Sequence, residues 1–126
     1  MLHKSLRHTL LATLVLITAA APASARSSQP GFDGRWSVLI ITDAGSCDRS
    51  YRYGVVVSRG RISYAGDSSV MISGGVDPRG RVSVSLRYGQ SAAQGSGRLS
   101  GSDGGGRWQG ASSGARCSGR WLAERR

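Results

Sequence analysis

The sequence predicts an all-β domain, a single small antiparallel meander of about eight strands that closes, or nearly closes, into a barrel. Beyond residue 33, apolar and polar residues alternate in several short runs, as expected for strands with one buried face. No window in this region shows the 3.6-residue period of a helix. Turn-forming residues separate the runs by short intervals, which favours hairpin connections between sequential strands.

A repeated tripeptide supports the same prediction. Gly-Arg followed by a large apolar residue occurs at 34–36, 60–62, 80–82, 97–99, 106–108 and 119–121. All copies but the first stand where a turn-rich stretch gives way to an alternating one. We therefore expect the glycine to supply the positive φ of a tight turn. The arginine then opens a strand on its solvent face, and the apolar residue points inward.

The first four strands follow from composition and alternation. A run rich in β-branched residues predicts a strand over 36–42, which residues 43–46 break. Alternation predicts a second strand over 51–58, and Arg59-Gly60 turns the chain into a third that begins at Ile62 and Tyr64. A fourth strand over 70–76 ends at Asp77-Pro78-Arg79-Gly80, where proline presets φ and glycine completes the reversal.

The last four strands are predicted over 81–88, 92–99, 107–112 and 115–124. The first of these shows the most regular alternation in the chain. The glycines between residues 95 and 106 indicate a hairpin loop and not a phosphate loop, because no helix follows them. The later inward faces carry glycines, which favours a narrow interior over a roomy cavity; these are Gly95, Gly97, Gly110 and Gly119.

Two cysteines support closure of the sheet. Cys47 lies just beyond the first predicted strand, and Cys117 lies within the last. An even count in a small exported domain favours a disulfide between them, and that bond would join the two ends of the meander. A sandwich or an open, strongly coiled sheet is the alternative architecture.

The amino terminus predicts export. Residues 1–25 have a basic opening, a run of about 12 apolar residues over 10–21 and the small residues Ala23-Ser24-Ala25, the order of a secretory signal peptide. The apolar run is too short to span a membrane. We predict cleavage after Ala25, a polar arm over 26–33 and the barrel-like domain over 34–126, exported to the periplasm or the extracellular medium, with no membrane span.

The mature chain would be strongly basic. It keeps 15 arginines against seven acidic residues, a formal charge of +8. Arginine guanidinium groups bind phosphate and carboxylate bidentately, so an anionic envelope or extracellular polymer is a candidate partner. Nucleic acid is a less favoured partner, because few aromatic residues stand between the arginines. Seven arginines on outward strand faces are the candidate anion-binding residues: Arg52, Arg81, Arg87, Arg98, Arg107, Arg116 and Arg120.

The composition argues against an enzyme. Histidine and lysine are absent after residue 25, which removes the usual general base and Schiff-base chemistry. The acidic residues are scattered in turn-like contexts, so no carboxylate pair is predicted. We predict no metal site and no cofactor, because two cysteines without histidine do not complete a zinc site.

Two resemblances add expectations. The Gly-x-Trp at Gly34 to Trp36 opens the first strand and arginines end the last, which resembles the calycin pattern of lipocalins and avidin-like proteins. This resemblance implies that Trp36 packs at the closed end of the barrel with Arg125 or Arg126 lying across it. It also implies an interior that carries a small apolar ligand.

The second resemblance spans nearly the whole mature chain. Residues 32–38, Cys47-Asp48, Tyr51-Arg52-Tyr53 and residues 117–121 are similar to a group of small exported alphaproteobacterial proteins of uncharacterised function. Some members carry a label relating to haem utilisation or adhesion. Haem would have to be held by a tyrosine or by Met71, since the mature chain lacks histidine.

The sequence thus favours a non-catalytic binding or envelope-accessory protein whose arginine-rich surface engages anionic polymers. The first alternative is a carrier of a small apolar ligand or haem inside a calycin-like barrel. The second is an adhesive or structural protein that associates through exposed apolar residues such as Val56 and Leu122.

Overall fold

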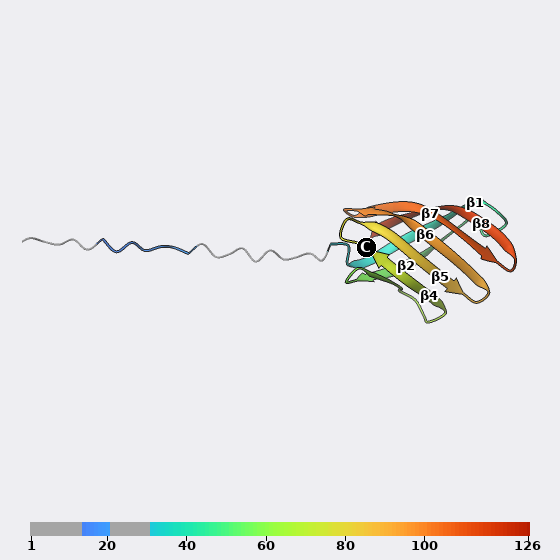
Figure 1. Ribbon diagram of the computed structural model, residues 1–126, viewed down its shortest axis with the longest axis horizontal. Coiled ribbons are helices and arrows are strands. Elements are labelled where there is room, and N and C mark those ends of the chain that lie inside the picture. Colours follow the sequence, from blue (N-terminus) through green and yellow to red (C-terminus); the bar gives the residue numbers. More distant parts are fainter. Residues whose placement is uncertain (1–13, 21–30) are drawn as a thin grey trace, which may run out of the picture.

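The computed structural model describes residues 14–20 and 31–126, and residues 31–126 form a closed eight-stranded antiparallel β-barrel (Figure 1). Each strand pairs with the next along the chain, and β8 pairs with β1 to complete the barrel. The predicted all-β meander is therefore confirmed, and it is closed. The strands are β1 (Gly34–Ala44), β2 (Ser50–Ser58), β3 (Arg61–Tyr64), β4 (Val70–Val76), β5 (Arg81–Tyr88), β6 (Ser91–Ser100), β7 (Asp103–Ser112) and β8 (Ala115–Arg125).

Two strands are longer than their composition indicates. Strand β1 continues through Asp43 and Ala44, because a register shift between Thr42 and Ala44 lets it keep pairing with β8. Strand β7 begins at Asp103 and includes three consecutive glycines. The hairpin loop expected over residues 95–106 is thus only the turn at residues 101–102, and the glycines flanking it lie within paired strands.

The five Gly-Arg repeats after the first divide into two kinds. Gly60 (φ 76°) and Gly80 (φ 88°) adopt the positive φ of turns and lead into β3 and β5, as expected. The expectation is wrong for the glycines at 97, 106 and 119, which lie inside β6, β7 and β8 at ordinary strand geometry. In those copies the missing side chain, and not φ, is what the fold requires. Every repeat places its arginine at the exposed surface and the next residue at least partly buried.

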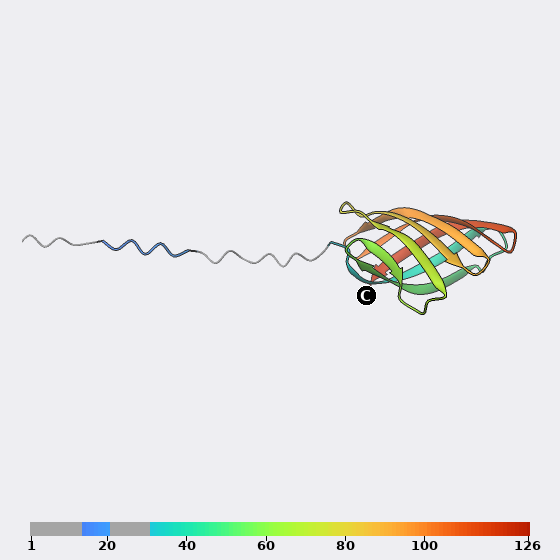
Figure 2. The ribbon, with the colours of Figure 1, turned by 60° about the horizontal axis from the view of Figure 1, so that its bottom comes forward.

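The barrel has a closed end and an open end. The chain enters β1 and leaves β8 at the same end (Figures 1 and 2), and the β2–β3, β4–β5 and β6–β7 turns lie there too. The buried core occupies this half, around Trp36, Val57, Val82 and Leu99. The other four connections surround the opposite end, which we call the mouth.

The seams of the barrel differ in strength. The β1–β8 seam is paired from Trp36–Arg125 to Ala44–Ser118, whereas β3 and β4 are joined by a single bridge between Arg61 and Gly75. A disulfide between Cys47 and Cys117 reinforces the β1–β8 seam, with Cα atoms 6.1 Å apart. The predicted disulfide is confirmed, and such bonds persist in oxidising compartments.

The predicted signal peptide lies outside the described residues, apart from residues 14–20, which form neither helix nor strand. Of the predicted polar arm, only residues 31–33 are described. Within the described part of the chain, no helix has the length and apolar composition required to cross a membrane.

Candidate ligand-binding cavity and arginine-rich outer face

The last two Gly-Arg-Trp repeats pair with each other across the β7–β8 ladder. Gly106 stands opposite Trp121, Arg107 opposite Arg120, and Trp108 opposite Gly119. Each tryptophan therefore faces a glycine on the neighbouring strand, and both indoles point into the barrel. The repeat that marks turns elsewhere in the chain forms here a self-complementary unit of two rings and two glycines.

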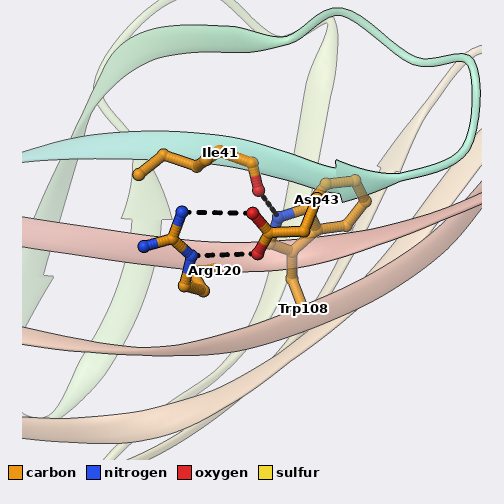
Figure 3. Close-up of polar contacts among 4 residues, drawn as sticks. All are labelled: Ile41, Asp43, Trp108 and Arg120. Atoms are coloured by element: carbon orange, nitrogen blue, oxygen red, sulfur yellow. Dashed lines mark hydrogen bonds and ion pairs between the residues drawn. The ribbon is translucent and has the colours of Figure 1, made fainter.

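Each indole crosses the opposing glycine to reach a carbonyl one strand further away. Trp108 Nε1 donates to the Ile41 carbonyl at 3.0 Å (Figure 3), and Trp121 Nε1 donates to the Ser96 carbonyl at 3.0 Å. A Cβ atom added at Gly119 would overlap the Ile41 oxygen, and one added at Gly106 would overlap the Ser96 oxygen. The glycines thus make room for the two hydrogen bonds that fix the rings.

These rings help to shape a small apolar cavity in the middle of the barrel. Its volume is about 100 Å³, and its lining is almost entirely apolar. Trp36 lies at its closed end, while Trp108 and Trp121 contribute to its wall. The narrow interior expected from the inward glycines is what this half of the barrel shows, because indole rings occupy the space that the glycines vacate.

The mouth above this cavity is wider. It holds a hollow of about 620 Å³, within the size range of small-molecule sites. The sequence-based expectation of a narrow interior is therefore wrong for this half. The two hollows are continuous, since both are lined by the same five residues: Tyr51, Tyr53, Leu86, Ala93 and Trp108.

Three tyrosines form one side of the mouth. The ring centroids of Tyr51 and Tyr53 are 5.8 Å apart, and the Tyr64 ring meets Tyr53 edge-on at 6.1 Å. Burial raises the pKa of the Tyr53 hydroxyl, and the neighbouring tyrosines add to that effect. Burial also raises the pKa of Tyr51, with a further contribution from Asp48. The hydroxyls of Tyr51 and Tyr53 consequently stay neutral across the physiological pH range and face the hollow as weakly polar groups.

The rim of the mouth is polar. The hydroxyls of Ser91 and Ser112 hydrogen bond to each other at 2.7 Å across β6 and β7. Asp48 lies on the β1–β2 loop, whose position is fixed by the disulfide and by a hydrogen bond from Thr42 Oγ1 to the Asp48 carbonyl at 2.6 Å. The hollow therefore changes from apolar at its base to polar at its rim.

The closed end is sealed by Trp36 and Arg125. The Arg125 guanidinium lies 4.7 Å from the centroid of the Trp36 ring and donates to the carbonyls of Asp33 at 2.7 Å and Gly31 at 3.0 Å. Trp36 Nε1 donates to the Phe32 carbonyl at 2.8 Å. Of the two arginines considered from the sequence, Arg125 covers the indole, while the Arg126 backbone N–H pairs with the Arg35 carbonyl.

The seven candidate arginines are all exposed, and six of them lie on one side of the barrel, the outer face of β5–β8. Arg81 stands opposite Arg98, and Arg107 opposite Arg120. The seventh, Arg52, lies apart on β2 and donates to Ser37 Oγ at 3.1 Å. The structure thus brings together six of the residues that the sequence proposed for anion binding and separates one.

One ion pair forms among residues 14–20 and 31–126. Arg120 Nε and Nη2 donate to the Asp43 carboxylate at 2.9 and 3.1 Å (Figure 3). This pairing lowers the pKa of Asp43, and the charge of Arg107 contributes further. Asp43 thereby offsets the repulsion expected between Arg107 and Arg120, which are directly opposite like charges.

Met71 and the residues considered for metal binding and adhesion do not gather at one site in the described part of the chain. Within the described residues, no group of three or more His, Cys, Asp or Glu side chains comes together to hold a metal ion. Met71 is 69% exposed on the outer face of β4 and does not line the cavity. Of the two apolar residues considered for adhesion, Leu122 is 50% exposed, whereas Val56 is partly buried.

Sequence reasoning missed the mouth. It named the tyrosines as possible haem ligands and not as the lining of a mouth, although Tyr51, Tyr53, Tyr64 and Tyr88 all line the hollow. The signal was available in their positions, because in a meander the start of the second strand and the ends of the third and fifth reach the same end of the barrel.

A scan against protein-family models and searches of curated proteins and of solved structures found no match to this chain.

Proposed function

We propose that this protein is a non-catalytic binding protein that holds one small, mainly apolar molecule inside its barrel. The observation that carries the proposal is the continuity of the apolar cavity with the wider mouth through Tyr51, Tyr53 and Trp108. A concave, largely apolar site with a few polar groups at one side is the usual form of a small-molecule site.

The shape of the hollow indicates the shape of the ligand. The lower cavity of about 100 Å³ accommodates a short apolar tail and nothing charged, because its walls offer almost no polar partner. The mouth of about 620 Å³ accommodates a bulkier part beside the tyrosine rings. The hydroxyls of Ser91 and Ser112 at the rim would bind an uncharged polar end group.

The site offers little support for turnover. The titratable groups lining the mouth are tyrosines and Asp48, and the pKa values of Tyr51 and Tyr53 are shifted away from neutrality. A general base requires a pKa near the working pH, so this lining favours storage or transport of a ligand over its conversion. Transport in the periplasm or the medium agrees with the predicted export signal and the disulfide.

Native mass spectrometry of protein exported to a bacterial periplasm and purified without reductant tests the proposal. We expect a monomer carrying an added small mass, which acid denaturation releases. If the mass corresponds to the bare oxidised chain, and remains so after incubation with 1-decanol as an amphipathic probe, the proposal is contradicted.

A further inference from the structure

The outer face of β5–β8 carries a shallow groove that is separate from the interior cavity. Two adjoining depressions, of about 670 and 650 Å³, share Gln94, Gln109 and Ser118. The floor is made of short side chains that alternate outward along the four strands, among them Ser83, Ser85, Ala92, Ser96 and Ala111. Because these side chains are short, the longer arginines beside them stand above the floor.

Arginines border the groove on both sides. Near the closed end, Arg81 faces Arg98 across β5–β6, and Arg107 faces Arg120 across β7–β8. Arg107 is the partner of Ser96, so Arg98 is its diagonal neighbour, at about 7–8 Å in a sheet of this kind. Towards the mouth, Arg87 and Arg116 stand at the two ends of a row that continues through Ala92 and Ala111.

The positive charge of this groove is largely uncompensated. Asp43 is bound by Arg120, and the remaining acids of the face, Asp103 and Glu124, stand opposite each other at the closed end. Within residues 31–126, no carboxylate forms an ion pair with the guanidinium of Arg81, Arg87, Arg98, Arg107 or Arg116, although Asp77 in the turn before β5 interacts electrostatically with Arg81. Facing like charges cost stability unless something neutralises them, so an anion in the groove would relieve repulsion built into the sheet.

We propose that this groove binds an acidic polysaccharide, a chain bearing repeated carboxylate or sulfate groups. The arginines would bind the acidic groups, and the serine hydroxyls and glutamine amides of the floor would bind the sugar hydroxyls. Along β5 the two borders are six residues apart, from Arg81 to Arg87, and along β8 they are four residues apart, from Arg116 to Arg120. A separation of roughly 13–20 Å suits an extended oligomer better than a single anion.

The same observations disfavour other polyanions. Single-stranded nucleic acid is usually held by aromatic side chains on which its bases stack. The outward positions of β5–β8 carry no aromatic residue, because Trp108 and Trp121 both point inward to backbone carbonyls. A membrane surface would need several large apolar side chains beside the arginines, whereas the floor offers alanine methyl groups and Leu122 is the one exposed large apolar side chain at the outward positions of β5–β8.

Binding of oligogalacturonate, followed by calorimetry at increasing salt, tests this inference in the full mature chain. We expect one oligomer per barrel, with affinity that falls as salt rises because the contacts are ionic. The double variant R87Q/R116Q should weaken binding by about tenfold or more, since each substitution removes a guanidinium together with its charge-assisted hydrogen bond to the oligomer. Neutral maltooligosaccharide should not bind.

The matched control removes the same charge elsewhere. Arg35 and Arg61 are exposed on β1 and β3, away from the groove, and R35Q/R61Q should bind as the wild type does. Equal weakening by both double variants would overturn the inference, because net charge alone would explain the attraction. Tighter binding of oligothymidylate or of anionic phospholipid vesicles than of oligogalacturonate would also overturn it. The groove and the mouth share lining residues, among them Ala92 and Ala111, but no arginine lines the cavity or the mouth, so the arginine variants test the groove without altering the proposed interior site.

Discussion

Trp108 on β7 stands directly opposite Gly119 on β8, and its indole crosses that glycine to hydrogen bond with the Ile41 carbonyl of β1. One side chain thus links three consecutive strands around the closing seam of the barrel. Trp121 does the same in the opposite direction, across Gly106 to the Ser96 carbonyl of β6. This reciprocal pair helps to shape the small cavity beneath the mouth.

The glycine in each pair is therefore required for packing. The substitution G119A places a methyl group against the Ile41 carbonyl, which is the acceptor of the Trp108 hydrogen bond, so it should lower the free energy of unfolding by about 2–3 kcal/mol. Urea denaturation followed by tryptophan fluorescence measures the effect.

Gly54 on β2 supplies the matched control. A Cβ atom added there would meet the Ala65 methyl group at 3.3 Å and the Trp36 carbonyl oxygen at an ordinary contact distance of 3.9 Å. G54A should change the free energy of unfolding by less than about 1 kcal/mol. Equal losses in G54A and G119A would show that the indole–glycine contact has no special role.

The disulfide should account for a large share of stability. Cys47 and Cys117 are 70 residues apart, and a crosslink closing such a loop contributes about 4 kcal/mol in the chain-entropy model. The double variant C47S/C117S should unfold at a lower urea concentration, because its free energy of unfolding should be lower by about 4 kcal/mol. Added reductant should destabilise the wild type similarly and leave the variant unchanged; a wild type insensitive to reductant while demonstrably reduced would contradict this expectation.

The cover over Trp36 yields a third prediction. R125Q removes the guanidinium over the indole and its hydrogen bonds to the Asp33 and Gly31 carbonyls, so we expect a loss of about 1–3 kcal/mol. R126Q should have little effect on unfolding, since the Arg126 contact in the structure is made by its backbone N–H. A reversed order of the two variants would refute the assignment of Arg125.

The free energy of unfolding should fall at acid pH, and protonation of Asp77 should account for part of that fall. Its carboxylate accepts the backbone N–H groups of Arg81 and Arg79, each at 2.9 Å, which lowers its pKa from the usual 3.8. The folded state therefore binds this proton less readily than the unfolded state. The stabilisation is present above about pH 4 and is lost as the pH falls through the folded-state pKa.

Comparing D77N with the wild type from pH 2 to 6 measures this contribution. The variant should be less stable than the wild type at pH 6, and the difference should shrink towards pH 2. A difference that stays constant over the range would show that the charge of Asp77 plays no part.

Most strands of the fold were predictable because alternation and turn residues are local features of the sequence. Alternation over residues 81–88 and the Asp77–Gly80 turn define a hairpin without reference to the rest of the chain. The long β7 was not predictable, because Gly104–Gly106 have poor strand propensity and are held in place by pairing on both sides. The roles of Gly106 and Gly119 likewise depend on register, which is a property of two strands together.

The candidate sites were predictable in part. Outward arginines follow from period-two alternation, but their gathering on β5–β8 depends on which strands are neighbours. Arg52 shows the limit of this prediction. It occupies an outward position in an alternating strand, as the other six arginines do, but its strand, β2, lies apart from β5–β8. The mouth was missed because a hollow arises from the side chains of many strands, and no single run of sequence encodes it.

The central claim is that the barrel interior binds a small apolar molecule, and Ala93 offers the most direct test. Its side chain faces inward where the lower cavity joins the mouth, whereas Ser96 faces outward on the same strand and lines neither hollow. Fluorescence titration with the neutral probe N-phenyl-1-naphthylamine should show one saturable site in the wild type and in S96F, and strongly weakened binding in A93F. Equal binding by S96F and A93F, or no saturable binding by the wild type, would contradict the account.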